Sequence, residues 1–246
     1  MMNTITLPSF NRCLAVVTLI AAFSLPSWSQ GSGANQISVG ATYNVPYFFV
    51  NDLFNTSYKG MINNGIGGEI IYSMDSMKMV NNYTMEISLG YFTLPFKDDE
   101  LASTFKKKNS LQSATVTSSW TSIPFSIGLT TLTRENKVQF FGSALANVSF
   151  VSFTQKVSDG GEFGSVNEAT ASASRIDVGL RLKGGVQIPI TNNVSISAHI
   201  GGYLPVYLIY YYYSNQGRNG VYAPLNYYIQ DFYLMGEAGA RLSFRF

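Results

Sequence analysis

The sequence contains few of the side chains from which metal and catalytic sites are usually built. Its 246 residues include a single cysteine, Cys13, and a single histidine, His199. One histidine cannot supply the clustered ligands of a zinc site, and one cysteine cannot form a disulfide within the chain. The composition therefore predicts no metal ion, no cofactor and no structural disulfide.

Charged side chains are also scarce. They make up 12% of the chain, about half of the roughly 25% found in soluble domains. Aromatic residues reach 14%, with 17 Phe and 16 Tyr, and the net charge is only +2. A nearly neutral chain lacks the basic surface that nucleic acid requires. We therefore expect no nucleic-acid partner, and a surface unlike that of an ordinary soluble domain.

One apolar run stands out, from Cys13 to Leu25, after Arg12 and before the small-residue pattern Ser27-Trp28-Ser29. It is shorter than the roughly 20 residues that a spanning helix needs. A basic residue, a short apolar core and small residues before a cleavage point are typical of a secretory signal peptide. We expect residues 1–29 to be a signal peptide and residues 30–246 to form a single domain.

Apolar and polar residues alternate over much of the remaining chain. Near its end, Leu242 and Phe244 alternate with Arg241 and Ser243. A period of two places the two sets on opposite faces of a β-strand. Other segments repeat this pattern, some with β-branched and aromatic content as the main signal. Eight strands are predicted, at 36–48, 65–74, 84–91, 114–132, 138–154, 175–188, 194–204 and 231–246.

The connections between these strands alternate in length. Short connections are expected at 75–82, 133–137 and 191–193, and long loops at 49–63, 95–113, 155–172 and 211–226. An up-and-down meander brings all short turns to one end and all long loops to the other, as in bacterial outer-membrane barrels. The predicted fold class is all-β, an eight-stranded antiparallel up-and-down transmembrane β-barrel.

The polar row of each strand is expected to face the barrel interior. It consists mostly of Ser, Thr, Asn and Gly, whereas a row facing water should be rich in Lys and Glu. Glycine relieves crowding inside a narrow barrel, and seven strands place one on this row: Gly40, Gly67, Gly90, Gly128, Gly179, Gly201 and Gly239. The opposite orientation, with the apolar row inside, describes a soluble lipocalin-like ligand-binding barrel and stays open.

Aromatic residues lie near both ends of the predicted strands, as expected for the two interfaces of a bilayer. Near the long loops are Tyr43, Tyr47, Phe48, Tyr91, Trp120, Phe150, Tyr207, Tyr228 and Phe232. Near the short turns are Tyr72, Tyr83, Phe140, Phe244 and Phe246.

The last strand carries a family resemblance. Ala240, Leu242, Phe244 and the final Phe246 alternate along it, which resembles the terminal signal of outer-membrane barrels. With eight strands, the chain is similar to the OmpX-like and OmpA-transmembrane-like barrels. This resemblance implies a location in a Gram-negative cell outer membrane, contact with its lipids, and recognition of these four residues by the outer-membrane assembly machinery.

Several charged or titratable side chains fall on the predicted interior row. They are Glu69, Glu86, Asp177, Arg181, Lys183, His199, Glu237 and Arg241, with Arg175 as a further candidate. Charges of both signs can neutralise one another inside a barrel, and an unpaired one is costly. We expect a structural polar network, with a narrow solute pathway as the alternative.

An enzymatic role finds little support in the sequence. Outer-membrane lipid A deacylases use a histidine and a serine two residues apart on a lipid-exposed strand, but Gly201 follows His199 at that spacing and Ser197 shares the interior row. Calcium binding at Asp98 to Glu100 lacks EF-hand spacing. Lys106 to Lys108 are expected to be solvated on a long loop, with contact to lipopolysaccharide phosphates or a host polyanion as the alternative.

The sequence thus predicts a non-enzymatic surface barrel whose four long extracellular loops carry its role. Loops are the usual place for contacts with partners. That role is either structural in the envelope or an interaction, as in adhesion or evasion, with an extracellular ligand or host surface. A narrow channel, a lipid-modifying enzyme and a soluble secreted barrel remain alternatives.

Overall fold

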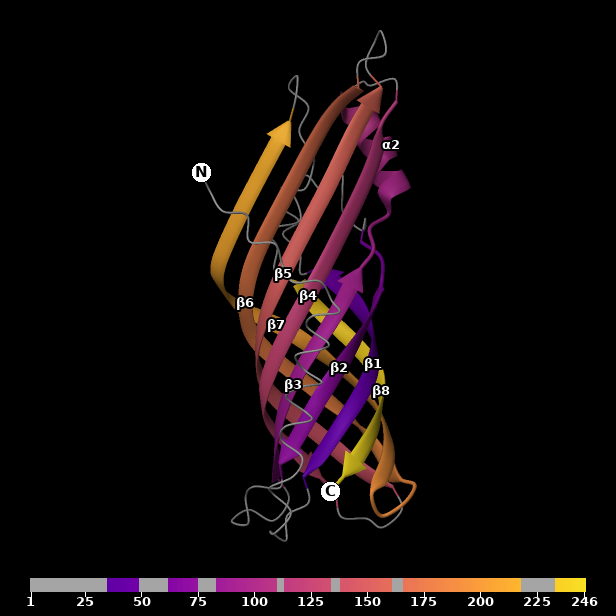
Figure 1. Cartoon of the computed structure of the whole chain (residues 1–246), viewed down its shortest axis with the longest axis vertical. Helices are drawn as coiled ribbons and strands as arrows, with labels where there is room; N and C mark the ends of the chain where they lie inside the picture. Colours follow the sequence, from indigo (N-terminus) through magenta and orange to yellow (C-terminus); the bar gives the residue numbers. More distant parts are fainter. Residues whose placement is uncertain are drawn as a thin grey trace.

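The computed structural model describes residues 35–48, 62–74, 83–109, 113–133, 138–160, 166–217 and 233–246. Within them the chain forms a closed barrel of eight antiparallel strands (Figure 1). The strands are β1 (Gln36–Phe48), β2 (Gly65–Met74), β3 (Tyr83–Leu94), β4 (Thr115–Leu132), β5 (Gln139–Gly160), β6 (Val166–Pro189), β7 (Val194–Gly217) and β8 (Tyr233–Arg245). The predicted eight-stranded meander is confirmed.

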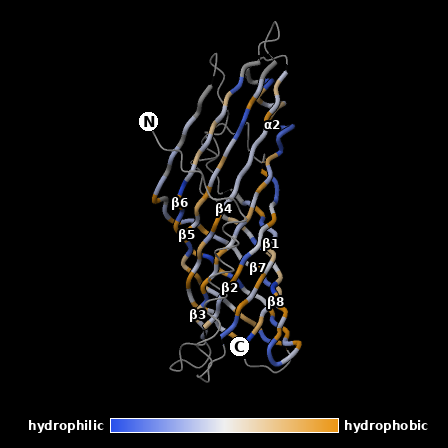
Figure 2. The backbone as a smooth tube through the Cα atoms, in the orientation of Figure 1, coloured by the Kyte–Doolittle hydropathy of each residue, from blue (hydrophilic) through white to orange (hydrophobic). Residues whose placement is uncertain are grey.

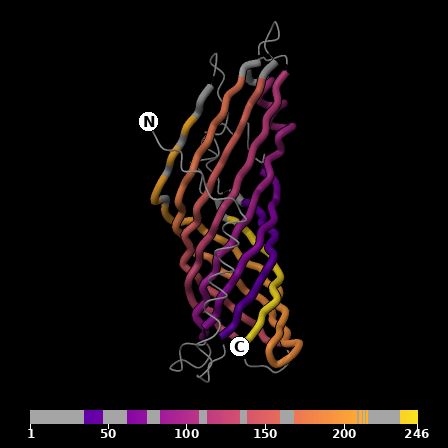
Figure 3. The backbone as a smooth tube through the Cα atoms, viewed as in Figure 1, coloured from indigo at the N-terminus to yellow at the C-terminus, as the bar shows by residue number. Residues whose placement is uncertain are grey.

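The strands follow one another around the barrel in sequence order. Figure 3 shows the first and last strands side by side, and Val39 of β1 is opposite Leu242 of β8. This pairing closes the ring, so that the closed part of the sheet has no free edge. The turn between β6 and β7 lies at the lower end of the barrel in Figure 1, where β8 also ends.

The apolar row of the strands faces outward. Leu180 and Leu242 are 49% and 40% exposed, whereas Glu237 and Arg241, on the opposite row, are only 8% exposed. Figure 2 shows the resulting alternation of hydrophobic and hydrophilic positions along the strands. The predicted orientation is therefore confirmed, and an interior lined by the apolar row, as in the lipocalin alternative, is not what the structure has.

Glycine lets neighbouring strands and interior side chains approach closely. A Cβ on Gly128 would lie 2.2 Å from the carbonyl oxygen of Ala144, and one on Gly239 would lie 2.4 Å from Cε1 of His199. Both distances are far below van der Waals contact. The interior therefore has no room for a side chain at these two positions.

Four strands, β4 to β7, continue above the closed ring as a curved sheet (Figure 1). We call this part the extension and define it as residues 115–121, 152–160, 166–174 and 212–217, which pair in register. On one side of it, β3 pairs with β4 only as far as Leu94 opposite Trp120.

The extension corrects two of the predicted loops. Residues 155–160 and 166–172 lie in β5 and β6, and residues 211–217 lie in β7. The rest of the expected loops 155–172 and 211–226 lies outside the described residues. Alanines at 169, 171 and 173 alternate there with Thr170 and Ser172. This pattern lacks large apolar residues, so it predicts a polar loop. The small and hydroxyl residues nevertheless alternate with a period of two, as in a strand.

A helix, α2 (Asp98–Asn109), lies within the expected loop 95–113. Acidic residues occupy its first turn and lysines its last, which complements the helix dipole. Leu101 and Phe105, four residues apart, are both buried. Its first residue, Asp98, accepts a hydrogen bond from the backbone N–H of Ser118 on β4, beyond the point where β3 stops pairing. No helix among the described residues is long and apolar enough to cross a membrane.

Helix α2 and the inner side of the extension share an apolar core. Leu101 and Phe105 belong to one cluster with Trp120, Phe153 and Met235, and the rings of Trp120 and Phe153 stack 5.1 Å apart. Trp120 was expected at the membrane interface, but it points inward because its parity is that of the interior row. The barrel is therefore polar inside at its lower part and apolar inside at its top.

Candidate functional site

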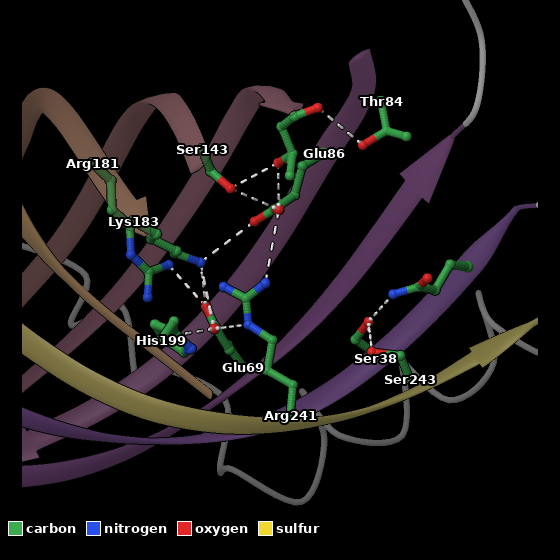
Figure 4. Close-up of polar contacts among 12 residues, drawn as sticks. Ser38, Glu69, Thr84, Glu86, Ser143, Arg181, Lys183, His199, Arg241 and Ser243 are labelled. Atoms are coloured by element: carbon green, nitrogen blue, oxygen red, sulfur yellow. Dashed lines mark hydrogen bonds and ion pairs between the residues drawn. The ribbon is translucent and has the colours of Figure 1, made fainter. Parts of the chain in front are cut away.

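All eight predicted interior side chains are buried inside the barrel. They come from β2 (Glu69), β3 (Glu86), β6 (Asp177, Arg181 and Lys183), β7 (His199) and β8 (Glu237 and Arg241). Each faces inward because it sits on the polar parity of its strand. Seven of them gather in one network, most of which Figure 4 shows; Asp177 lies in a separate pair.

Glu69 is at the centre of this network. Its carboxylate lies 2.9 Å from Nη1 of Arg181, 3.0 Å from Nζ of Lys183 and 3.2 Å from Nε of Arg241. Three cations from two strands therefore converge on one buried acid, as Figure 4 shows. Such convergence is favourable only because further carboxylates balance the excess positive charge.

Glu237 and Glu86 supply that balance. Arg181 donates to both oxygens of Glu237: Nη2 lies 2.7 Å from Oε2, and Nε lies 3.0 Å from Oε2 and 3.1 Å from Oε1. Lys183 reaches Glu86 at 3.4 Å. Three carboxylates thus face three cations in the network. The ion pairs and hydrogen bonds of the network replace the solvation that these buried charges lose.

Hydroxyl groups complete the hydrogen bonding of the Glu86 carboxylate. Thr130 Oγ1 donates to Oε2 of Glu86 at 2.8 Å and is also 2.8 Å from the hydroxyl of Ser143. Thr130 and Ser143 are not among the residues predicted for the network. Their place on the interior parity of β4 and β5 was the signal, but it does not show which hydroxyl meets a carboxylate.

Arg175 and Asp177 form a second buried pair on β6. Their closest atoms, Nη2 and Oδ2, are 2.8 Å apart, and the guanidinium of Arg175 lies over the ring of Phe153 at 5.6 Å. This pair borders the apolar cluster around Trp120. Among the described residues, the buried Arg, Lys, Asp and Glu side chains comprise four acids and four bases, so the interior is neutral when His199 is uncharged.

His199 lies between two carboxylates of the network without bonding to either. Its Nε2 is 3.9 Å from Glu69 and 3.8 Å from Glu237, and neither ring nitrogen has a hydrogen-bond partner within the described part of the chain. Ser197 is buried on the same inner row. The histidine and serine therefore do not form the lipid-exposed pair that the deacylase alternative needs.

The network separates two cavities inside the barrel. A cavity of about 360 Å³ opens at the short-turn end, where Ser38, Ser197 and Arg245 are among its lining residues. Above the network, a cavity of only about 20 Å³ is lined by residues that include Tyr203 and Met235. Glu69, Arg181 and Glu237 of the network line the upper cavity, and Glu86 and Arg241 line the lower one.

The described residues contain no group of three or more His, Cys, Asp or Glu side chains placed to hold a metal ion. The expected assembly signal lies on a different surface from the network. Ala240, Leu242, Phe244 and Phe246 are all exposed on the outer side at the end of β8. This places them where another protein or lipid can contact them.

Comparisons with known proteins give distant similarities in structure. No protein-family model and no curated protein matches the chain. Solved structures that align with it include a major outer membrane protein from Thermus thermophilus, at 12% identity and a TM-score of 0.47, covering 88% of this chain and 100% of that one. Ail, the attachment invasion locus protein of Yersinia pestis, aligns at 14% identity and a TM-score of 0.45, with the same two coverages.

The outer membrane protease OmpT from Escherichia coli aligns at 12% identity and a TM-score of 0.40, covering 90% of this chain and 99% of that one. Similarities of this size assign neither a family nor a role to the chain. Its function has to be argued from its own residues.

Proposed function

We propose that this chain is a non-enzymatic outer-membrane protein of the Gram-negative type, with a sealed barrel and a surface-exposed extension. One observation carries the proposal: the closed barrel is apolar on its outside and charged on its inside. Exposed apolar side chains such as Leu182, Ile188 and Ile200 form an outer surface that is unfavourable in water. In a bilayer the same surface is in its preferred environment.

Closure of the sheet supports the same conclusion. A bilayer core offers no hydrogen bonds to free backbone groups, so only helices and closed barrels span it. The pairing of β1 with β8 satisfies this condition around the whole ring. Export through a signal peptide at residues 1–29 and recognition of Ala240, Leu242, Phe244 and Phe246 by the assembly machinery remain parts of the proposal.

The interior favours a closed structural role over conduction. Eight strands leave space mainly for side chains, and here ion pairs fill the middle of the lumen while an apolar cluster fills its top. A solute entering from the short-turn end meets the Glu86 and Arg241 side chains at the inner end of the lower cavity. Envelope support or contact with an extracellular ligand or host surface therefore fits better than transport.

Three measurements test this proposal: cell fractionation, a heat-shift gel and planar-bilayer conductance. We expect the protein to be recovered from the membrane fraction only with detergent, and to migrate differently on gels before and after heating. In planar bilayers we expect no steady conductance. Recovery from the soluble periplasm would contradict the membrane location, and a reproducible single-channel current would favour the channel alternative.

A further inference from the structure

The outer face of the sheet changes chemistry abruptly above the barrel. Ile123, Phe150 and Ile176 form one apolar row across β4, β5 and β6. Two residues farther along each strand, about 7 Å away, the corresponding row consists of hydroxyl residues. These three strands therefore switch together at the same place in the register.

Two complete rows of hydroxyl residues follow this switch, and we call them the hydroxyl face. The first consists of Thr121, Ser152 and Ser174, and the second of Ser119, Thr154 and Ser172. None of the six is buried. Neighbouring strands are about 4.8 Å apart, so the face is a regular array of groups that both donate and accept hydrogen bonds.

This composition is unusual for a sheet face in contact with water alone. Such faces commonly carry Lys and Glu side chains, which keep the protein soluble and discourage association of sheets. Neither of these two rows contains a charged residue, and the first charge on the same face is Lys156, one row farther from the barrel, between Thr117 and Thr170. A neutral surface with dense hydrogen-bonding groups is matched by a neutral ligand that presents hydroxyl groups of its own.

Exposed tyrosines flank the same face on β7. Tyr212 pairs with Ser174 and extends the first hydroxyl row, and Tyr210 pairs with Ile176 in the apolar row below. About half of each side chain is exposed. An aromatic ring offers a rigid flat surface at low entropic cost, so the surface combines apolar ring faces with hydrogen-bonding hydroxyls.

We propose that the hydroxyl face and the adjoining tyrosines bind the sugars of a lipid-linked oligosaccharide in the same membrane leaflet. A sugar ring has hydroxyls at its edge and an apolar C–H face, which match the two parts of this surface. The array begins where the apolar outer surface ends, so in the proposed membrane orientation it lies at the level of sugars attached to lipid. The inference rests on the proposed outer-membrane location.

Hydrogen exchange of the reconstituted protein tests this inference. The protein is placed in vesicles of lipopolysaccharide that carries core sugars, and in vesicles of the same lipid stripped of its sugars. In the sugar-bearing vesicles we expect roughly tenfold slower exchange for peptides covering residues 115–121, 152–158 and 168–174. Residues 123–131, on the apolar outer surface, should exchange equally in both.

Variants identify the surface responsible. Replacing the central hydroxyl residues, Thr154→Val with Ser172→Val, keeps strand propensity and should abolish the sugar-dependent difference. The matched control Ser103→Val, on the exposed side of α2, should leave it unchanged. A gel that still shows the heat-dependent shift establishes that each variant is folded.

Two results would overturn the inference without affecting the membrane proposal. One is an exchange rate that does not depend on the sugars while the protein remains inserted. The other is equal or stronger slowing by free oligosaccharide added to the stripped vesicles, which would make a soluble glycan the ligand. Failure of the protein to float with either vesicle would instead contradict the proposed location.

Discussion

At the level of single residues, Glu69 determines whether the interior is neutral. It faces three cations, and no other acid in the part of the chain that the structure describes contacts all of them. Inside a barrel an unpaired charge has no bulk water to solvate it, so the loss of one partner costs more than the pair itself contributes.

Replacing Glu69 by glutamine keeps the size of the side chain and removes its charge. We expect Glu69→Gln to lower the free energy of unfolding by about 3–5 kcal/mol, because the network then carries three cations and two carboxylates. Urea unfolding of the folded barrel in detergent measures the change.

Two variants serve as controls for this prediction. Glu168→Gln makes the same substitution at an exposed site on β6 and should change the stability little. Adding Lys183→Met to Glu69→Gln restores equal numbers of charges and should recover part of the loss. If the double variant is no more stable than Glu69→Gln, the charge balance is not what stabilises the interior.

Gly239 tests how tightly the interior is packed around His199. In Gly239→Ala the new methyl group would lie 2.4 Å from the imidazole and 2.7 Å from the carbonyl oxygen of Ala41. Relief requires side-chain and backbone shifts, so we expect a loss of about 1–3 kcal/mol in the same unfolding measurement. Gly142→Ala, whose Cβ would meet nothing closer than 3.7 Å, is the matched control and should be neutral or slightly stabilising.

At the level of elements, α2 covers the inner side of the extension. Leu101 and Phe105 contribute its buried contacts, and Asp98 occupies a backbone donor at the edge of β4. The helix therefore covers two surfaces: the apolar inner side of the extension and part of the free edge of β4. Either surface favours aggregation when it is exposed.

Removing the two apolar contacts should release α2 without opening the barrel. We expect the double variant Leu101→Ala, Phe105→Ala to lose about 2–5 kcal/mol of local stability per site, seen as rapid proteolysis between residues 95 and 113. The heat-dependent gel shift should persist. Ser103→Ala, on the exposed side of the same helix, should resist the protease like the parent, and loss of the gel shift in the double variant would show that α2 also supports the ring.

The sequence predicts the elements of the ring better than those above it. In the ring, large apolar residues alternate with polar ones. In β6 and β8 this alternation predicts both which row faces outward and which charged side chains lie inside the barrel. In the extension the inner row contains small residues such as Ala169 and Ala171, which are buried in the same apolar cluster as Leu101 and Phe105 of α2. The helix is not predicted, because its acidic start and basic end also fit a ligand site and a solvated patch, and the complement to a helix dipole becomes evident only once the helix is known.

The sequence predicts which charged residues face the barrel interior, but only partly how they pair. Parity alone places Glu69, Arg181 and Glu237 inside the barrel. Which acid meets which base depends on strand tilt and register, since Glu69 on β2 contacts Lys183 from β6 across the lumen. Contacts between strands so far apart in the sequence leave no pattern in the sequence of either strand.

At the level of the whole molecule, the position of an outward-facing residue relative to the membrane should decide how much a charged substitution there lowers the folding stability. Leu180 and Thr170 lie on the same outer row of β6. We expect Leu180→Arg to cost about 2–4 kcal/mol of folding stability in lipid vesicles, because arginine near the bilayer midplane is unfavourable. Thr170→Arg, on the extension, should cost little, and similar losses at the two sites would contradict the proposed position of the membrane.

The central claim is that the apolar row faces lipid and the polar row faces a closed interior. Its most direct test uses single cysteines at Leu180, Ile196, Ser197 and Thr170 in a Cys13→Ser background, each carrying a small fluorophore, with brominated acyl chains as quencher. Ile196 and Ser197 are neighbours on β7 with opposite orientations, and Ser197 lines the lower cavity. Strong quenching at Leu180 and Ile196, with little at Ser197 and Thr170, is the predicted result; quenching at Ser197 but not at Ile196 would contradict the account.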